Sequence, residues 1–143
     1  MKIMKFKGKV AAWFYLLIFF ILVMQYPILF SIYKDGITVD SMISLVIIVL
    51  LIAIFISIIF INYVELNDEY MLIVFSFIKK KIYYEDIISL TETNNPLSSL
   101  AASLDRIEIK CKKETNVMIS ILDKKSFYKE IKLHNTNIEI YPK

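Results

Sequence analysis

The sequence has few of the residues from which catalytic and metal-binding sites are built. It contains one cysteine, one histidine and two glycines in 143 residues, and no glycine after position 36. A single cysteine cannot form a disulfide within the chain, and a segment without glycine cannot form a glycine-rich loop that cradles phosphate. His134 falls in the last turn of an expected helix, and Cys111 falls on the apolar face of an expected strand. We therefore expect a protein that is not an enzyme and that holds no cofactor or metal ion.

Charged residues are absent from two long stretches in the N-terminal half. Neither Val10–Tyr33 nor Ser41–Val64 contains Asp, Glu, Lys or Arg. A helix needs about 20 apolar residues to cross a hydrocarbon core of about 30 Å, so each stretch is long enough for a transmembrane helix. Aromatic residues typical of lipid interfaces lie near their ends, at Trp13, Tyr15 and Tyr63. The sequence therefore predicts transmembrane helices over residues 10–33 and 41–64.

Gln25 and Pro27 interrupt the first apolar stretch. A proline kinks a membrane helix, and a glutamine amide can bond to the neighbouring helix. Because the two stretches contain no acidic or basic side chain, we interpret both residues as packing features rather than as a transport site. A transporter accessory subunit that uses them as its contact is a weaker alternative.

The lysines around the apolar stretches predict the orientation of the chain. Four of them lie in a basic arm of residues 1–9, and Lys34 is the lysine of the connection between the stretches. By the positive-inside rule, the N-terminus is cytoplasmic, and the second crossing returns residues 65–143 to the cytoplasm. Cleavage as a signal peptide is the alternative, but no small-residue cleavage pattern follows Met24.

Residues 65–143 have the pattern of a small mixed domain. They hold twelve acidic and twelve basic residues, which argues against nucleic acid as a partner because that requires a clustered basic face. Apolar and polar residues alternate along Arg106–Lys112 and Asn116–Leu122, as on half-buried strands. Phe127 and Ile131 instead share one face of a helix. The expected fold class is therefore α+β, with antiparallel strands and one late amphipathic helix.

The stretch from Asn95 to Lys110 resembles a known family. Its proline, its run of small and hydroxyl residues, and its acidic residue before the lone arginine are similar to the motif of bacterial pleckstrin-homology-like (PH-like) domains in YyaB-like membrane proteins. The matching residues are Pro96, Ser99, Ala102, Ser103, Asp105 and Arg106. The resemblance covers residues 65–143 and extends to the membrane helices before them. It implies a curved antiparallel sheet or split barrel closed by a C-terminal helix, in a bacterial cell membrane.

Two groups of residues in this domain are candidate sites. Arg106 can form a fork of hydrogen bonds to carbonyls or to a carboxylate, which lysine does less well, so we predict that the family motif is structural rather than a ligand-binding site. Lys79, Lys80 and Lys81 fall at an expected hairpin, where each can contribute about 1 kcal/mol of attraction to anionic lipid. The alternative, which we favour, is a solvated turn that keeps the hairpin soluble.

These features leave two hypotheses for the function. In the first, the protein is a non-enzymatic integral membrane protein that presents a PH-like interaction domain to a protein or peptide partner in the cytoplasm. In the second, it is an immunity protein that protects the cell from a bacteriocin or another membrane-active peptide. Both predict contact with membrane lipids and the same two-span topology, and they differ in the phenotype of a deletion strain.

Overall fold

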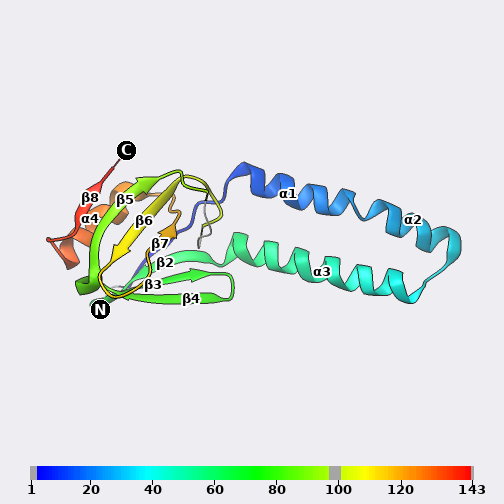
Figure 1. The fold of residues 1–143 in the computed structure, drawn as a ribbon, viewed down its shortest axis with the longest axis horizontal. Helices are drawn as coiled ribbons and strands as arrows, with labels where there is room; N and C mark the ends of the chain where they lie inside the picture. The colour runs from blue at the N-terminus through cyan, green and yellow to red at the C-terminus, as the bar shows by residue number, and fades with distance from the viewer. Residues whose placement is uncertain (1–2, 97–100, 143) are drawn as a thin grey trace.

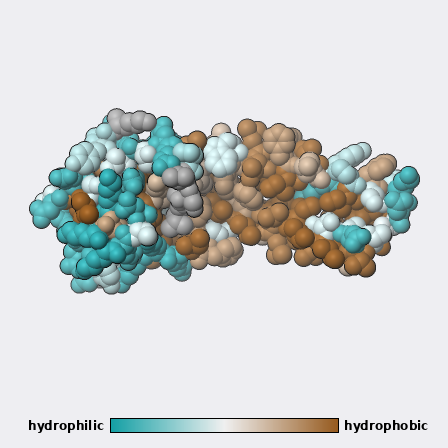
Figure 2. Space-filling view, viewed as in Figure 1, coloured by the Kyte–Doolittle hydropathy of each residue, from teal (hydrophilic) through white to brown (hydrophobic). Residues whose placement is uncertain are grey.

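The structure, a computed structural model, describes residues 3–96 and 101–142. Two helical segments extend side by side from one end of a sheet domain, as Figure 1 shows. Hydrophobic side chains cover the helical part, whereas most of the visible face of the domain is hydrophilic (Figure 2). The predicted α+β fold class is confirmed.

The first helical segment is divided into two helices. Helix α1 spans Ala12–Val23 and helix α2 spans Tyr26–Asp35, and together they form a segment of 24 residues that is long and apolar enough to cross a membrane. Pro27 lies in the first turn of α2, where its missing N–H needs no helical partner. The Nε2 atom of Gln25 is buried and has no hydrogen-bond partner within the described residues, so it does not make the expected bond to the other helix.

The second helical segment is one continuous helix, α3, over Val39–Phe60. Thr38 caps it, because its side chain accepts a hydrogen bond from the N–H of Ser41 and the Ser41 hydroxyl oxygen accepts one from the N–H of Thr38. This helix is also long and apolar enough to cross a membrane. It ends at Phe60 rather than at the predicted Val64, because the residues that follow pair as a strand.

The N-terminal arm is part of the sheet. Residues 1–9 were expected to form a basic arm outside the domain, but Met4–Lys7 form strand β1, which pairs antiparallel with β2, Asn62–Leu66. Phe6 is buried and its neighbouring lysines are not, so this short stretch has the alternation of a half-buried strand. The two helical segments therefore stand where a turn would connect two neighbouring strands.

Within the described residues, the domain contains two four-stranded sheets. The first has the order β1–β2–β3–β4, in which β3 is Tyr70–Phe75 and β4 is Ile78–Tyr83. The second has the order β7–β6–β5–β8. Its strands are β5 (Ile87–Thr93), β6 (Arg106–Cys111), β7 (Val117–Ile119) and β8 (Glu139–Tyr141), and a short 3₁₀ turn, Tyr84–Asp86, links the sheets.

The sheets also meet at the end of β1. Gly8 forms an isolated bridge with Ile121, just after β7, while its N–H donates to the carbonyl of Asn62 at 2.8 Å. A Cβ on Gly8 would lie 2.1 Å from the side-chain oxygen of Asn62, so a larger residue here would require the Asn62 side chain to move. The N-terminal strand thus closes the barrel-like arrangement on the side away from β4.

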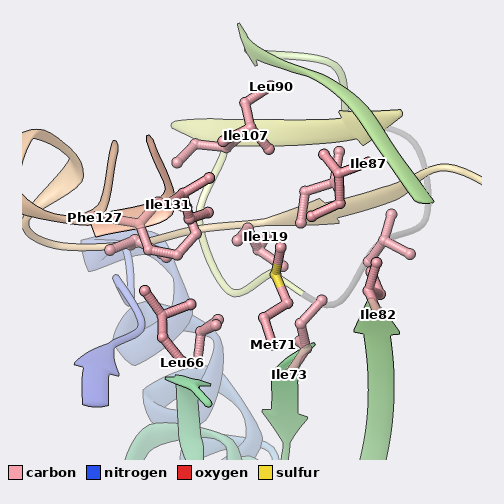
Figure 3. Packing of buried hydrophobic residues seen from close by; sticks show 14 of the residues in the cluster. Leu66, Met71, Ile73, Ile82, Ile87, Leu90, Ile107, Ile119, Phe127 and Ile131 are labelled. Atoms are coloured by element: carbon pink, nitrogen blue, oxygen red, sulfur yellow. The ribbon is translucent and has the colours of Figure 1, made fainter. Parts of the chain in front are cut away.

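The core lies between the sheets and the C-terminal helix. Helix α4, Lys124–His134, begins at Asp123, whose carboxylate accepts a hydrogen bond from the N–H of Ser126. Its Phe127 and Ile131 are fully buried, and each contributes about 1.5–3 kcal/mol through removal of its apolar surface from water. Figure 3 shows these side chains pointing toward residues of both sheets, which include Leu66, Met71, Ile73, Ile82, Ile87, Leu90, Ile107 and Ile119.

Candidate functional site

The junction between the helices and the domain is short and hydrogen-bonded. Gly8–Ala11 connect β1 to α1, and Ile61 connects α3 to β2. In the first connection, the N–H of Lys9 donates to the carbonyl of Ser120 and that of Ala11 to the carbonyl of Ala102, both at 3.0 Å. In the second, the carbonyl of Ile61 accepts from the N–H of Ser76 at 2.6 Å. Both connections are therefore short, and backbone hydrogen bonds attach them to the domain.

Arg106 lies at the start of β6 and is buried, with 6% of its surface exposed. Its Nε donates to the carbonyl of Ser103 and its Nη1 to the carbonyl of Asn95, both at 2.7 Å. Burial lowers the pKa of Arg106 from its usual value, but a guanidinium keeps its charge at neutral pH. Its charge is therefore directed at main-chain carbonyls on both sides of the loop between β5 and β6.

The other residues of the family motif lie around this arginine or outside the described residues. Strand β5 ends at Thr93, before the exposed Pro96, and Ala102 and Ser103 are buried. The hydroxyl of Ser103 accepts a hydrogen bond from the N–H of Asp105 at 3.2 Å. Ser99 falls outside the described residues. The described motif residues thus lie between β5 and β6 and at the start of β6.

Asp105 is the centre of a charged network that joins four parts of the chain. Its carboxylate accepts from Lys124 of α4 and, at 2.6 Å, from Lys9 in the connection to α1. Lys124 also donates to Glu92 of β5 at 3.0 Å, and the hydroxyl of Tyr128 donates to the other oxygen of Glu92 at 2.9 Å. We call these five residues the Asp105 network. It connects the segment just before α1 to α4, the helix that closes the domain.

The protonation states of the Asp105 network follow from its contacts. Burial alone raises the pKa of Asp105, but the hydrogen bonds and charges of Lys124 and Lys9 outweigh it and hold that pKa below its usual value. Burial lowers the pKa of Lys124, yet its bonds to Asp105 and Glu92 give a net increase. Burial, followed by the bond to Glu92, raises the pKa of Tyr128 well above its usual value. The contacts of the network therefore favour the charged forms of Asp105 and Lys124 and the neutral form of Tyr128.

Lys79, Lys80 and Lys81 do not form one cationic patch. They lie on β4, and Lys80 makes an ion pair with Glu114 at 3.2 Å. The ammonium group of Lys81 lies 3.7 Å from the centre of the Tyr70 ring. Lys79 is exposed, and within the described residues it has no ion pair or ring contact. Of the three, Lys79 is thus the best placed to meet an external anion.

The lone histidine and cysteine are placed apart from each other. His134, in the last turn of α4, stacks on Tyr84 with ring centres 4.5 Å apart. Cys111 is partly buried at the end of β6, and burial raises the pKa of its thiol. Within residues 3–96 and 101–142, no group of three His, Cys, Asp or Glu side chains is arranged to hold a metal ion.

Two features of this region were not found from the sequence. The Asp105 network depends on Lys9 and Lys124, which are 96 and 19 positions away from Asp105. The contact between the β3–β4 hairpin and the end of α3 depends on Ser57 and Ser76, whose hydroxyl groups are hydrogen-bonded. The acidic residue beside the lone arginine was the available signal for the first feature, and nothing local signals the second.

Comparison with known proteins agrees with this arrangement. The family model described as Bacterial PH domain matches residues 61–135, which is more than half of the chain and extends from the start of β2 to the end of α4. No curated protein matches the sequence, and no solved structure matches it. The chain belongs to the bacterial PH domain family.

Proposed function

We propose that this chain is an integral membrane protein that holds its PH domain against the cytoplasmic face of a bacterial cell membrane, where the domain binds a protein or peptide partner without catalysis. One observation carries the proposal. The two segments long enough to span a membrane continue into adjacent strands of the domain through Gly8–Ala11 and Ile61. A domain attached in this way has the end with the helices directed at the membrane and the opposite end directed at the cytoplasm.

The charges near the junction support the cytoplasmic side. Lys5, Lys7 and Lys9 lie on or just after β1, at the domain end of the helices. Lys5 lies over the Tyr63 ring at 3.3 Å, and Lys9 is paired with Asp105. Lysines next to membrane spans favour the cytoplasmic side, and Lys79 adds a cation for anionic lipid on that side.

The outer face of α4 is the surface that we propose for the partner. It lies at the end of the domain remote from the helices in Figure 1. Its Leu133 is 71% exposed. The helix also carries three exposed lysines, Lys125, Lys129 and Lys132. A partner that contacts this face would meet it without approaching the lipid. The matching motif of YyaB-like proteins supports a place for the chain in that narrower group.

The topology is tested with a reporter enzyme that is active only outside the cytoplasm. We expect no activity when the reporter follows Lys143 and full activity when it is inserted at Gly36. Gly36 is a suitable control position because it follows α2 in open space, where an added Cβ atom would have no neighbour within 4 Å. Activity at both positions, or at neither, would contradict the two-span arrangement.

The interaction is tested with a photoreactive residue at Lys129 in intact cells. We expect a defined adduct with one protein or peptide at this position. The same adduct should be missing at the control position Lys110, which is exposed on β6. Equal adduct patterns at both positions would contradict the proposal that the partner binds the outer face of α4. Self-protection is the second hypothesis, and a deletion strain that becomes sensitive to a membrane-active peptide would favour it.

A further inference from the structure

The tip of the β3–β4 hairpin exposes two large apolar side chains. Strand β3 ends at Phe75 and β4 begins at Ile78, so Ser76 and Phe77 form the turn. Phe77 is 75% exposed and Ile78 is 54% exposed. Figure 1 shows that this tip points in the same direction as the helices and reaches the beginning of the helical part. The exposed apolar tip thus lies at the end of the domain that faces the membrane in the proposed function.

Hydrogen bonds fix the depth of the tip relative to α3. The N–H of Ser76 donates to the carbonyl of Ile61, and the hydroxyl groups of Ser76 and Ser57 are bonded to each other. Ser57 lies within α3, one turn before its last residue, Phe60. The turn of the hairpin therefore lies beside the membrane helix and not beyond its end.

The aromatic residues of α1 give an independent measure of this depth. The rings of Phe14 and Phe55 are in contact, with centres 5.1 Å apart, so the first turn of α1 lies level with Phe55 of α3. Trp13 and Tyr15, on either side of Phe14, are 44% and 50% exposed, as expected for side chains at a lipid interface. Ser57 is two residues from Phe55, or about 3 Å along a helix. The hairpin tip is therefore close to the level of these interfacial aromatics.

The polar groups of the turn are compatible with this position. Backbone groups that enter a lipid environment need internal hydrogen bonds. Phe75 and Ile78 pair across the hairpin, and Ser76 is bonded through its N–H to Ile61 and through its hydroxyl to α3. Ser76 has a φ of 55°, a left-handed conformation that is uncommon for a side chain larger than glycine and is held by these contacts. Phe77 is thus presented outward by a turn that is already ordered.

From these observations we infer that Phe77 and Ile78 insert into the lipid interface as a third membrane contact, beside the end of α3. The inference rests on the proposed function, because it needs α3 to span the membrane. The apolar side chains leave water, and Lys79 follows them on β4, about 3.3 Å further from the tip, at the depth of the lipid headgroups. The hairpin adds a lateral contact that prevents the domain from tilting about its two connections.

The test places a fluorescent probe sensitive to its environment at single cysteines in the full chain with Cys111→Ser. The positions are Phe77→Cys, Leu133→Cys and Val46→Cys, in vesicles of phosphatidylethanolamine and phosphatidylglycerol that contain nitroxide-labelled lipid. Leu133 is a matched control because it is 71% exposed but lies on α4, away from the helices. Val46, in α3 and 59% exposed, reports whether that helix spans the membrane.

We expect the probe at position 77 to emit at shorter wavelength than the probe at 133 and to be quenched by nitroxides near the headgroups. The probe at position 46 is expected to be quenched by nitroxides deep in the acyl chains. If 46 is in lipid and 77 behaves like 133, the inference is overturned and the proposed function stands. If 46 also behaves like 133, the membrane-spanning function itself fails.

A second measurement retains Cys111 and does not depend on that substitution. A benzophenone side chain at position 77 should form adducts with lipid, whereas the same side chain at position 133 should not. Adducts of position 77 with a second copy of the chain, or with another protein, would overturn the inference because the tip would then be covered by protein.

Discussion

Arg106 is buried and uses its guanidinium to hold two main-chain carbonyls, those of Ser103 and Asn95. The nearby charges are arranged differently, since Asp105 is paired with lysines rather than with its neighbouring arginine. At the scale of single residues, the domain therefore separates two tasks. The arginine positions the loop between β5 and β6, and the acidic residue beside it connects the loop to the helix junction and to α4.

Replacement of Arg106 tests the first of these tasks. Arg106→Ala removes, among its contacts, the charged hydrogen bonds to the carbonyls of Ser103 and Asn95 and should lower the free energy of unfolding by about 3 kcal/mol. Arg106→Lys keeps the charge without the fork and should cost about 2 kcal/mol. Both values can be measured from the urea dependence of proteolysis of the detergent-solubilised chain. A lysine variant as stable as the native protein would show that charge, and not the fork, matters.

The close approach of Gly8 to the Asn62 side chain predicts how substitutions at these two positions change stability. Gly8→Ala should lower stability by about 1–3 kcal/mol, because its new methyl group overlaps the buried amide of Asn62. Asn62→Ala should cost less, because the Nδ2 atom of Asn62 has no hydrogen-bond partner within the described residues. The double variant should regain most of the loss from Gly8→Ala, as a double-mutant cycle of thermal midpoints would show. Additive losses would contradict the overlap.

The Asp105 network predicts a dependence on acidic pH. The folded-state pKa of Asp105 lies below its unfolded value, so this group stabilises the fold above the unfolded value of about 3.9 and loses that effect as the pH falls further. The native chain should therefore lose its stability advantage over Asp105→Asn as the pH falls from about 4 through the lower folded-state pKa of Asp105. Thermal unfolding of both chains across this range measures the difference. A constant difference would show that the carboxylate charge is not responsible.

At the scale of elements, the β3–β4 hairpin and the end of α3 act together. The hairpin is bonded to Ser57 of α3 and to Ile61 just after it, and its exposed apolar tip precedes Lys79. In our inference, this exposed apolar tip is the part of the hairpin that meets lipid. The ion pair of Lys80 with Glu114 also shows that neighbouring lysines on one strand have different surroundings.

Lys79 should contribute to lipid preference more than lysines elsewhere. Near an anionic surface one lysine is worth about 1 kcal/mol, which corresponds to about a fivefold preference for anionic lipid at the adjacent position. Lys79→Ala should reduce this preference, measured by electron spin resonance of spin-labelled phosphatidylglycerol and phosphatidylcholine. Lys125→Ala is the matched control, because Lys125 is exposed on α4. The same reduction in both variants would indicate a general effect of net charge.

At the scale of the whole molecule, the domain is discontinuous in sequence. Strand β1 and the segment from β2 to β8 form one unit, and the two helical segments are inserted between β1 and β2. Phe6 of β1 is buried and contacts Phe127 of α4, with ring centres 5.4 Å apart. The domain therefore cannot be separated from the helices by a single cut.

This discontinuity predicts how soluble fragments behave. A fragment of residues 62–142 should be unstable by at least about 3 kcal/mol relative to the complete domain, because it loses Phe6 and leaves the edge of β2 unpaired. Residues 3–9 joined to residues 62–142 by a short glycine-containing turn should fold in water. Circular dichroism and thermal unfolding of the two fragments distinguish them. Equal stability would show that β1 is dispensable.

Local patterns in the sequence determined the helices, the alternating strands and the amphipathic α4, because each pattern depends on residues that are close together along the chain. The lone arginine in a loop of small residues similarly pointed to a structural anchor. The tertiary structure alone decided that Met4–Lys7 of the basic arm form a strand, that Lys9 meets Asp105, and that Ser76 meets Ser57 of α3. The physical reason is that these contacts join segments whose separation in sequence carries no periodic signal, and pairing is decided only when the core closes and brings them together.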